Sequence, residues 1–342
     1  MDLINQGLSF SYFLFLHFFR MMYWVWIPGF LFSAFFSLRY RECARSRLLS
    51  RGGFFAALLY GITSSPSRKK ALDIAGELMQ MSARDEEVLV FLIASRSLVI
   101  YILAVLAAMM GAEFALGQFI GGVVMALLVV AGLRLLEKEK PVRRYSGANL
   151  VPGKSPTWLG LLLSVSGWRE ALKYICREFS LFWVNLAIGI ILGGFILAAG
   201  LQKWSIELAL MGNGGFLTDI LNAFAAPIIA VILFVPPVGN VMIVTGLFKS
   251  YAISYPGVVS FILASLVSPL ILPRYFRIFG KRKALVLIGL IFLSAIVSAL
   301  LTTWAYALIG FRPDPVTMGR NFSHKIISWL PFIMGKMSGR GM

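Results

Sequence analysis

The chain has 342 residues, of which 59% are hydrophobic and only 14% are charged, and its mean hydropathy is +0.83. These values exclude an ordinary soluble domain, in which about a quarter of the residues are charged. The formal net charge of +17 does not indicate nucleic-acid binding, because the sequence has no basic face interleaved with aromatic residues and no nucleic-acid-binding motif. The composition predicts an all-α, polytopic membrane protein that is embedded in a lipid bilayer.

Apolar runs long enough to cross about 30 Å of hydrocarbon recur along the chain. We expect spanning helices near 12–38, 87–109, 112–133, 181–202, 256–273 and 284–310. Two further apolar stretches, 53–83 and 216–250, are interrupted by proline, glycine and polar residues. With these interrupted stretches included, the sequence predicts about 8–10 membrane segments.

The basic residues lie in the connections between the hydrophobic runs. Residues 39–51 hold five arginines against one acid, residues 134–178 hold nine basic residues against four acids, and residues 274–283 hold five basic residues and no acid. The positive-inside rule places all three segments in the cytoplasm and the N-terminus outside. We therefore expect a multi-pass protein of the cell inner membrane, with no removable signal peptide because no basic region precedes the first apolar run.

An internal repeat is indicated by comparing the chain with itself at an offset of 170 residues. Nine of 42 positions are then identical between residues 54–95 and residues 224–265. Each half also has the same order of a long helix, an apolar stretch, a proline break, a second stretch and two final helices. The expected regions are membrane repeat 1 at 1–136, a cytoplasmic linker loop at 137–180, membrane repeat 2 at 181–311 and a basic C-terminal tail at 312–342.

The two repeats are expected to have inverted topology. The first long helix ends at the basic segment 39–51, whereas the helix 181–202 begins after a basic segment. Inverted repeats with broken helices are typical of secondary transporters, in which the breaks of both halves meet near the middle of the membrane. The breaks here are Pro66–Lys70 and Pro236–Asn240. The alternative interpretation is that the prolines only kink the helices for packing.

The stretch FVPPVGNVMIVTGLFKSYAISYPGVVSFILASLVSPLIL resembles the second signature of the bacterial permease family that includes the organoarsenical efflux permeases. The stretch PGFLFSAFFSLRYRECARSRLLSRGGFFAALLYG is similar to the opening helix, amphipathic linker and glycine-terminated helix of that family. The resemblance covers most of residues 20–310 and implies a permease.

The two breaks depart from the pattern of this family. The first break of the family usually reads Cys-Ser-Cys, and its thiolates would suit a soft metal or trivalent arsenic. Here the matching position reads Pro66, Ser67 and Arg68. At the second break Pro236 and Pro237 stand where a cysteine is common, while Gly239 and Asn240 remain. A substrate held by thiolates is therefore not expected.

The charged segment after the first break allows two interpretations. Lys69, Asp73 and Glu77 are spaced i, i+4 and i+8 and share one helix face. In the first interpretation, the half-helix that begins at Ser67 and Arg68 lies within the membrane, its cations hold an anion, and the two acids are counter-ions or proton carriers. In the second, the segment does not enter the membrane and its charges form a solvated cytoplasmic face.

Four further residues are candidates for the substrate path. Arg96 lies about two turns into an otherwise apolar helix, where it either contacts an anion, pairs with an acid or snorkels to the interface. Ser95 and Ser265 occupy equivalent positions of the repeat and offer either hydroxyls to a pore or small side chains to a helix contact. Asn240 either orients a solute or caps the half-helix that follows it.

The sequence thus predicts a permease that exports a small solute along a path between the two breaks. No catalytic motif, nucleotide-binding loop, metal cluster or cofactor motif is visible, so we expect a non-enzymatic transporter driven by a gradient. The rival function is a membrane scaffold or assembly component without transport. The solute is expected to be uncharged or amphipathic, with an anion and a metalloid or metal species as alternatives, and a homo-oligomer is compatible with the sequence.

Overall fold

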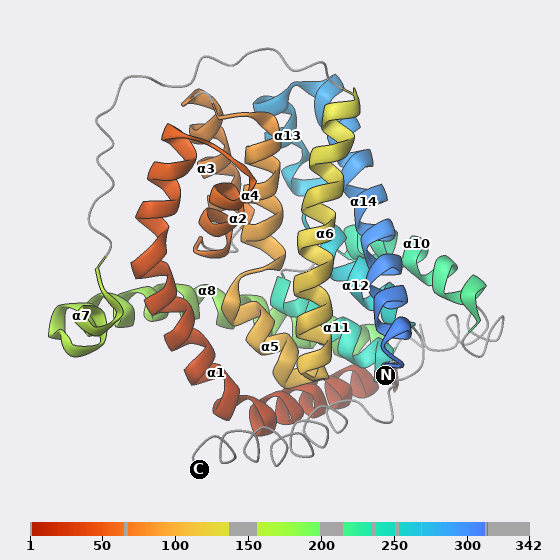
Figure 1. The fold of residues 1–342 in the computed structure, drawn as a ribbon. Coiled ribbons are helices and arrows are strands. Elements are labelled where there is room, and N and C mark those ends of the chain that lie inside the picture. The colour runs from red at the N-terminus through yellow and green to blue at the C-terminus, as the bar shows by residue number, and fades with distance from the viewer. Residues whose placement is uncertain are drawn as a thin grey trace, which may run out of the picture.

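The computed structural model describes residues 2–64, 68–81, 83–136, 156–198, 215–233, 237–249, 253–267, 269–311 and 313. All regular elements in these residues are helical, as expected for a chain that must satisfy its backbone hydrogen bonds in lipid. Two long helices in contact with each other, α6 (Ala112–Leu136) and α14 (Lys281–Leu308), run in opposite directions in the view of Figure 1.

The remaining elements of the first part of the chain are α1 (Asp2–Ser50), α2 (Phe54–Ile62), α3 (Arg68–Gln80), α4 (Asp85–Ser97) and α5 (Ile100–Met110). Those of the second part are α7 (Trp158–Leu163), α8 (Val165–Ala198), α10 (Phe216–Leu233), α11 (Pro237–Lys249), α12 (Tyr255–Ala264), the 3-10 helix η1 (Pro269–Ile271) and α13 (Leu272–Phe279). Each interrupted apolar stretch of the sequence therefore holds two helices with a break between them.

Several helices are long and apolar enough to cross a membrane. In the described residues these are α6, α10, α14 and the part of α8 from Val165 to Phe195. The pair α4 and α5 meets the same test together, although it is bent by 41° at its break. The prediction of a polytopic α-helical membrane protein with broken helices is thereby confirmed.

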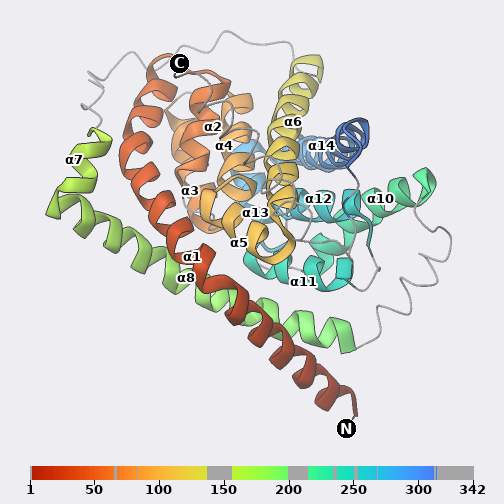
Figure 2. The same cartoon turned by 60° about the horizontal axis from the view of Figure 1, so that its bottom comes forward.

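The helices α1 and α8 cross on one side of the bundle and run in opposite directions (Figure 2). They approach so closely that a Cβ atom at Gly194 would lie 2.0 Å from the Ser11 hydroxyl oxygen. Contacts of this kind are typical of membrane helices, which associate through small residues because lipid gives no hydrophobic drive for helix association. Beyond the expected span, α1 continues to Ser50 because Ala44 and Leu48, one turn apart, are both buried against the bundle.

The segment expected to be a cytoplasmic linker loop, 137–180, is helical in its second part. Residues 137–155 lie outside the described residues, α7 follows them, and α8 begins at Val165. Ala171, Tyr174 and Glu178 are buried on one face of α8, while the charged residues between them point outward. The helix begins earlier than expected because this segment is amphipathic, so hydropathy alone does not detect it. The predicted tail, 312–342, lies outside the described residues except for Pro313.

Hydrogen bonds to the buried side chain of Glu87 join the starts of α2 and α4. The carboxylate of Glu87, which is only 4% exposed, accepts bonds from the backbone N–H of Gly53 at 2.7 Å and of Arg84 at 3.1 Å. Gly53 has φ of 114°, a conformation that favours glycine. A single carboxylate thus satisfies N–H groups at the ends of two helices and fixes how they pack.

The close packing of α2 on α4 depends on glycine at position 61. Substitution of this glycine therefore tests the contact by its effect on stability. A Cβ atom at Gly61 would lie 2.5 Å from Ala94 Cβ and 2.7 Å from the Phe91 carbonyl oxygen. We expect Gly61→Ala to lower the free energy of unfolding by about 1–3 kcal/mol through overpacking, measured by thermal or denaturant unfolding in detergent. The matched control is Gly76→Ala on α3, where the nearest atom is 3.9 Å away and stability should be unchanged or higher. Equal effects of the two substitutions would contradict the close α2–α4 contact.

Candidate functional site

The first break separates α2 from α3. Thr63 and Ser64 follow α2 and are fully buried. The Thr63 hydroxyl donates to the Leu59 carbonyl oxygen at 3.0 Å, and the Ser64 hydroxyl donates to the Tyr60 carbonyl oxygen at 2.7 Å. These side chains add hydrogen bonds to carbonyl groups in the last turn of α2. The predicted path residues Pro66 and Ser67 lie outside the described residues.

Beyond this break, α3 carries the predicted charged residues. Arg68 and Lys69 form its first turn. Asp73 and Glu77 are exposed, whereas Ala75 and Leu78 on the other face are buried. The Asp73 carboxylate pairs at 3.0 Å with Arg274 on α13, and the two side chains are 58% and 36% exposed. The structure therefore gives Asp73 a partner that sequence spacing did not indicate, and a role of these residues in a path stays a prediction.

The second break separates α10 from α11. Pro236 lies outside the described residues, and Pro237 is the first residue of α11, a position that suits proline because its missing N–H needs no partner there. Gly239 lies against α8, where a Cβ atom at Gly189 would be 2.2 Å from Gly239 Cα. The two backbones are thus in direct contact, and glycine is required at this crossing.

Asn240 lies in the first turn of α11 and is fully buried. Neither its amide nitrogen nor its amide oxygen has a hydrogen-bond partner in the part of the chain that the structure describes. An unpaired buried amide costs about 1–3 kcal/mol, so its retention requires an explanation, for example a solute or water that binds it. Of the predicted residues with described side chains, Asn240 is the one whose surroundings point most directly to a ligand.

The last turn of α4, just before the break to α5, holds Ser95 and Arg96. The Ser95 hydroxyl donates to the Leu92 carbonyl oxygen at 3.0 Å, so its proton serves the helix end. Arg96 is 3% exposed and therefore does not reach solvent in the described structure.

Glu178 is a buried charge that the sequence did not single out. It lies on α8 within the expected linker, and its side chain is fully buried. It accepts a hydrogen bond of 3.5 Å from the Tyr101 hydroxyl and pairs at 3.4 Å with Arg177. The spacing of Ala171, Tyr174 and Glu178 by three and four residues was the available signal, since it places the acid on the buried face of a helix.

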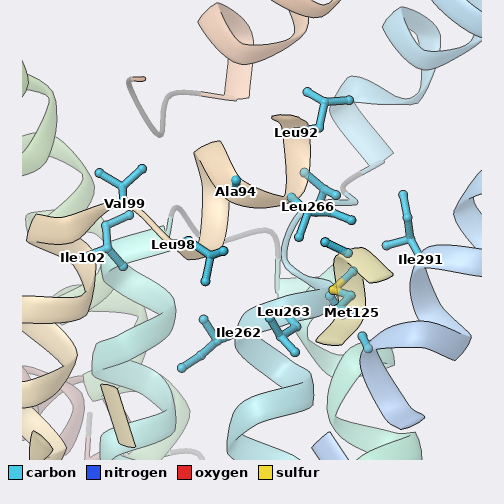
Figure 3. Close-up of a cluster of buried hydrophobic side chains, with 14 of the residues drawn as sticks. Leu92, Ala94, Leu98, Val99, Ile102, Met125, Ile262, Leu263, Leu266 and Ile291 are labelled. Carbon is cyan, nitrogen blue, oxygen red and sulfur yellow. The ribbon is translucent and has the colours of Figure 1, made fainter. Parts of the chain in front are cut away.

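The end of α12 packs near the α4–α5 break. Figure 3 shows Leu92 and Leu98 of the first segment in one cluster with Ile262, Leu263 and Leu266, with Met125 of α6 and Ile291 of α14 beside them. Ser265 ends α12, and its hydroxyl donates to the Ile262 carbonyl oxygen at 2.6 Å. Ser95 and Ser265 therefore play the same local role at equivalent positions: both bond their own helix backbone.

Ion pairs connect helix ends at the end of the bundle where α6 finishes and α14 begins (Figure 1). Arg134 of α6 makes two bonds to Glu86 of α4, at 2.8 and 3.1 Å. Lys283 of α14 pairs with Asp85 of α4. The basic residues predicted to lie in the cytoplasm thus pair with acids at the start of α4, which groups them on one end of the molecule.

Cysteine chemistry is not available at either break in the described residues. Cys43 on α1 is partly buried and Cys176 on α8 is exposed, and both are free thiols. In the described residues no group of three or more histidine, cysteine, aspartate or glutamate side chains could hold a metal ion. The polar groups at the breaks are instead hydroxyls, amides and single charges.

Comparisons with known proteins give a consistent result. A family described as "Predicted permease" matches residues 11–304 of the chain. The chain is also similar to "Putative permease Rv2963" of Mycobacterium tuberculosis (strain H37Rv), with 26% identity over 291 residues that cover 80% of this chain and 71% of the relative. No solved structure matches the chain.

The contact between Asp73 and Arg274 can be measured with a double-mutant cycle of Asp73→Asn and Arg274→Gln. Because both side chains are partly exposed, we expect a coupling free energy of about 0.2–1 kcal/mol in the unfolding equilibrium, which high salt should weaken. A suitable reference is Lys173→Gln, which breaks the exposed Lys173–Glu170 pair within α8 and should be nearly neutral. A coupling above about 2 kcal/mol would contradict a solvated pair.

Proposed function

This chain belongs to the family of predicted permeases, and on that premise we propose that it is a secondary transporter that exports a small solute across the cell inner membrane. The solute passes between the two broken elements, α2–α3 and α10–α11. The single observation that carries this proposal is Asn240, a fully buried amide without a hydrogen-bond partner in the described residues, at the start of a half-helix.

The start of α11 is suited to hold a solute. The first N–H groups of a helix have no partner within the helix and carry a partial positive charge. In transporters with broken helices, such half-helix ends bind polar groups of the solute. The direct backbone contact between Gly239 and Gly189 holds this end of α11 against α8, so that Asn240 is fixed in place.

We also propose that the two halves of the chain are inverted repeats, an arrangement typical of secondary transporters. The elements α2 to α6 are matched in order by α10 to α14, with bounds that differ by about the 170 residues of the sequence offset. The helices of the two sets also pack alike. In the first set α2 packs on α4 and α4 packs on α6, and in the second set α10 packs on α12 and α12 packs on α14. The opposite directions of α6 and α14 in Figure 1 fit an inversion.

The proposed transport is powered by an ion gradient or by the gradient of the solute. Asp73 and Glu77 are retained as proposed counter-ions or proton carriers, and Arg96 and Ser265 as proposed members of the path. An uncharged or amphipathic solute is favoured over an anion, because the buried amide of Asn240 carries no charge that would offset the desolvation of an ion.

The proposed topology is tested by cysteine labelling at position 155 in the segment that joins the repeats. In a variant with Cys43→Ser and Cys176→Ser, we expect Ser155→Cys to react with a membrane-impermeant maleimide in inside-out vesicles and not in intact cells. Cells opened with detergent provide the positive control. Labelling of residue 155 in intact cells would reverse the proposed orientation.

Transport is tested by flux in proteoliposomes with three probes: glycerol, inorganic phosphate and arsenite. We expect the protein to raise the flux of at least one probe above that of protein-free liposomes, and Asn240→Leu to reduce it about 10-fold, because a lost hydrogen bond to the solute is worth roughly 1.4 kcal/mol.

The matched control is Thr245→Val on the same helix, which is equally buried but whose hydroxyl donates to the Val241 carbonyl oxygen at 2.7 Å. This variant should keep flux within about twofold of the wild type, because its hydroxyl already has a partner. Absence of flux for every probe, together with purification in a fixed ratio with another membrane protein, would favour the scaffold function instead.

A further inference from the structure

A second buried amide without a partner lies on α6. Gln118 is 1% exposed, and neither its amide nitrogen nor its amide oxygen has a hydrogen-bond partner among the described residues. Buried side-chain amides are nearly always paired in proteins, so such a residue indicates a missing water or ligand. The helix around it is strongly apolar, with a mean hydropathy of 2.4, and it has no need of a glutamine in order to span the membrane.

Gln118 lies between an aromatic cluster and a helix break. One turn before it on the same face, the Phe114 ring packs on Phe248 of α11 and Tyr255 of α12, with ring centres 5.0 and 5.2 Å apart. One turn after it, a Cβ atom at Gly122 would lie 2.4 Å from the Leu98 side chain at the α4–α5 break. The amide is thus placed in the interior, on a face of α6 that runs from α11 to the break.

Helix packing of α6 does not explain the glutamine. The neighbouring face carries Gly117 and Gly121, which lie against Tyr255 of α12 and against Ser298 and Thr302 of α14. The Ser298 hydroxyl donates to the Gly121 carbonyl oxygen, so this contact already has its hydrogen bond. Gly117 and Gly121 thus give α6 close contacts with α12 and α14 that do not use the carboxamide of Gln118, which remains free to bind another molecule.

We propose that Gln118 lines the solute path and determines its specificity, together with Asn240, so that the path takes an uncharged solute with both hydrogen-bond donors and acceptors. This proposal rests on the proposed permease function. A carboxamide offers two donors and one acceptor, which a hydroxyl or amide group of a solute can match. Two neutral amides provide no charge to offset the desolvation of an ion.

The path is tested by cysteine accessibility in the full-length protein with Cys43→Ser and Cys176→Ser, reconstituted in proteoliposomes. We expect Gln118→Cys to react with the small, uncharged, water-soluble thiol reagent methyl methanethiosulfonate and glycerol to slow that reaction. The matched control is Val129→Cys, a fully buried apolar position on the same helix, which should not react. If Gln118→Cys is as unreactive as Val129→Cys, the proposal is overturned, whether or not the protein transports glycerol.

A stability measurement separates solute binding from a structural role. We expect Gln118→Leu to raise the thermal unfolding temperature by about 2 °C or more, since an unpaired amide is replaced by an apolar group of similar size. The same variant should lower glycerol flux about 10-fold. A structural glutamine would give the reverse result, with a lower unfolding temperature and unchanged flux. If the wild-type protein transports none of the probes while Gln118→Cys still reacts, the proposed permease function is wrong, but the proposal that Gln118 lines a water-filled path is supported.

Discussion

The main constraint on this protein is that a helix broken inside a bilayer must still satisfy its backbone polar groups. Lipid supplies no hydrogen-bond partner, so each break has to be closed by the protein itself. The chain does this with serine and threonine at the ends of α2, α4 and α12. Their hydroxyls donate to carbonyl groups of the last turn, as Ser64, Ser97 and Ser265 do at 2.7, 2.7 and 2.6 Å. Local side-chain hydrogen bonds of this type lower the free-energy cost of ending a helix in an apolar environment.

The same constraint accounts for the close helix contacts. A break is protected only if a neighbouring helix covers it, and close approach requires small residues. Gly61 at the end of α2 lies against Ala94 of α4, and Gly239 at the start of α11 lies against Gly189 of α8. The glycines of the breaks therefore serve packing as well as flexibility. This explains why the packing and path interpretations of the breaks are not exclusive: the residues that seal a break also hold the polar groups beside it.

Much of the fold was predictable because hydropathy, proline and glycine act locally. The apolar runs gave the membrane class, and the interrupted stretches 53–83 and 216–250 gave the broken elements, since Pro237 marks the start of α11. The partners of charged residues were not predictable, because they depend on contacts between distant segments. Glu178 accepts a hydrogen bond from Tyr101, which is 77 residues away in the sequence, and Asp73 accepts one from Arg274, which is 201 residues away. The burial of Gln118 could likewise not be predicted from the sequence, because one polar residue hardly changes the mean hydropathy of α6.

Charged side chains at the end of the bundle and polar side chains in its interior are partnered differently. At the end where α6 finishes, Arg134 and Lys283 bind acids of α4, and part of each pair is open to solvent. Exposed pairs contribute only about 0.2–1 kcal/mol each, so they orient helix ends without locking them. In the interior, neither polar side-chain atom of Gln118 or of Asn240 has a partner among the described residues, and both side chains are neutral amides. A transporter needs states that differ by only a few kcal/mol, and weak pairs at the surface with neutral binding groups inside allow such a balance more readily than buried unpaired charges would.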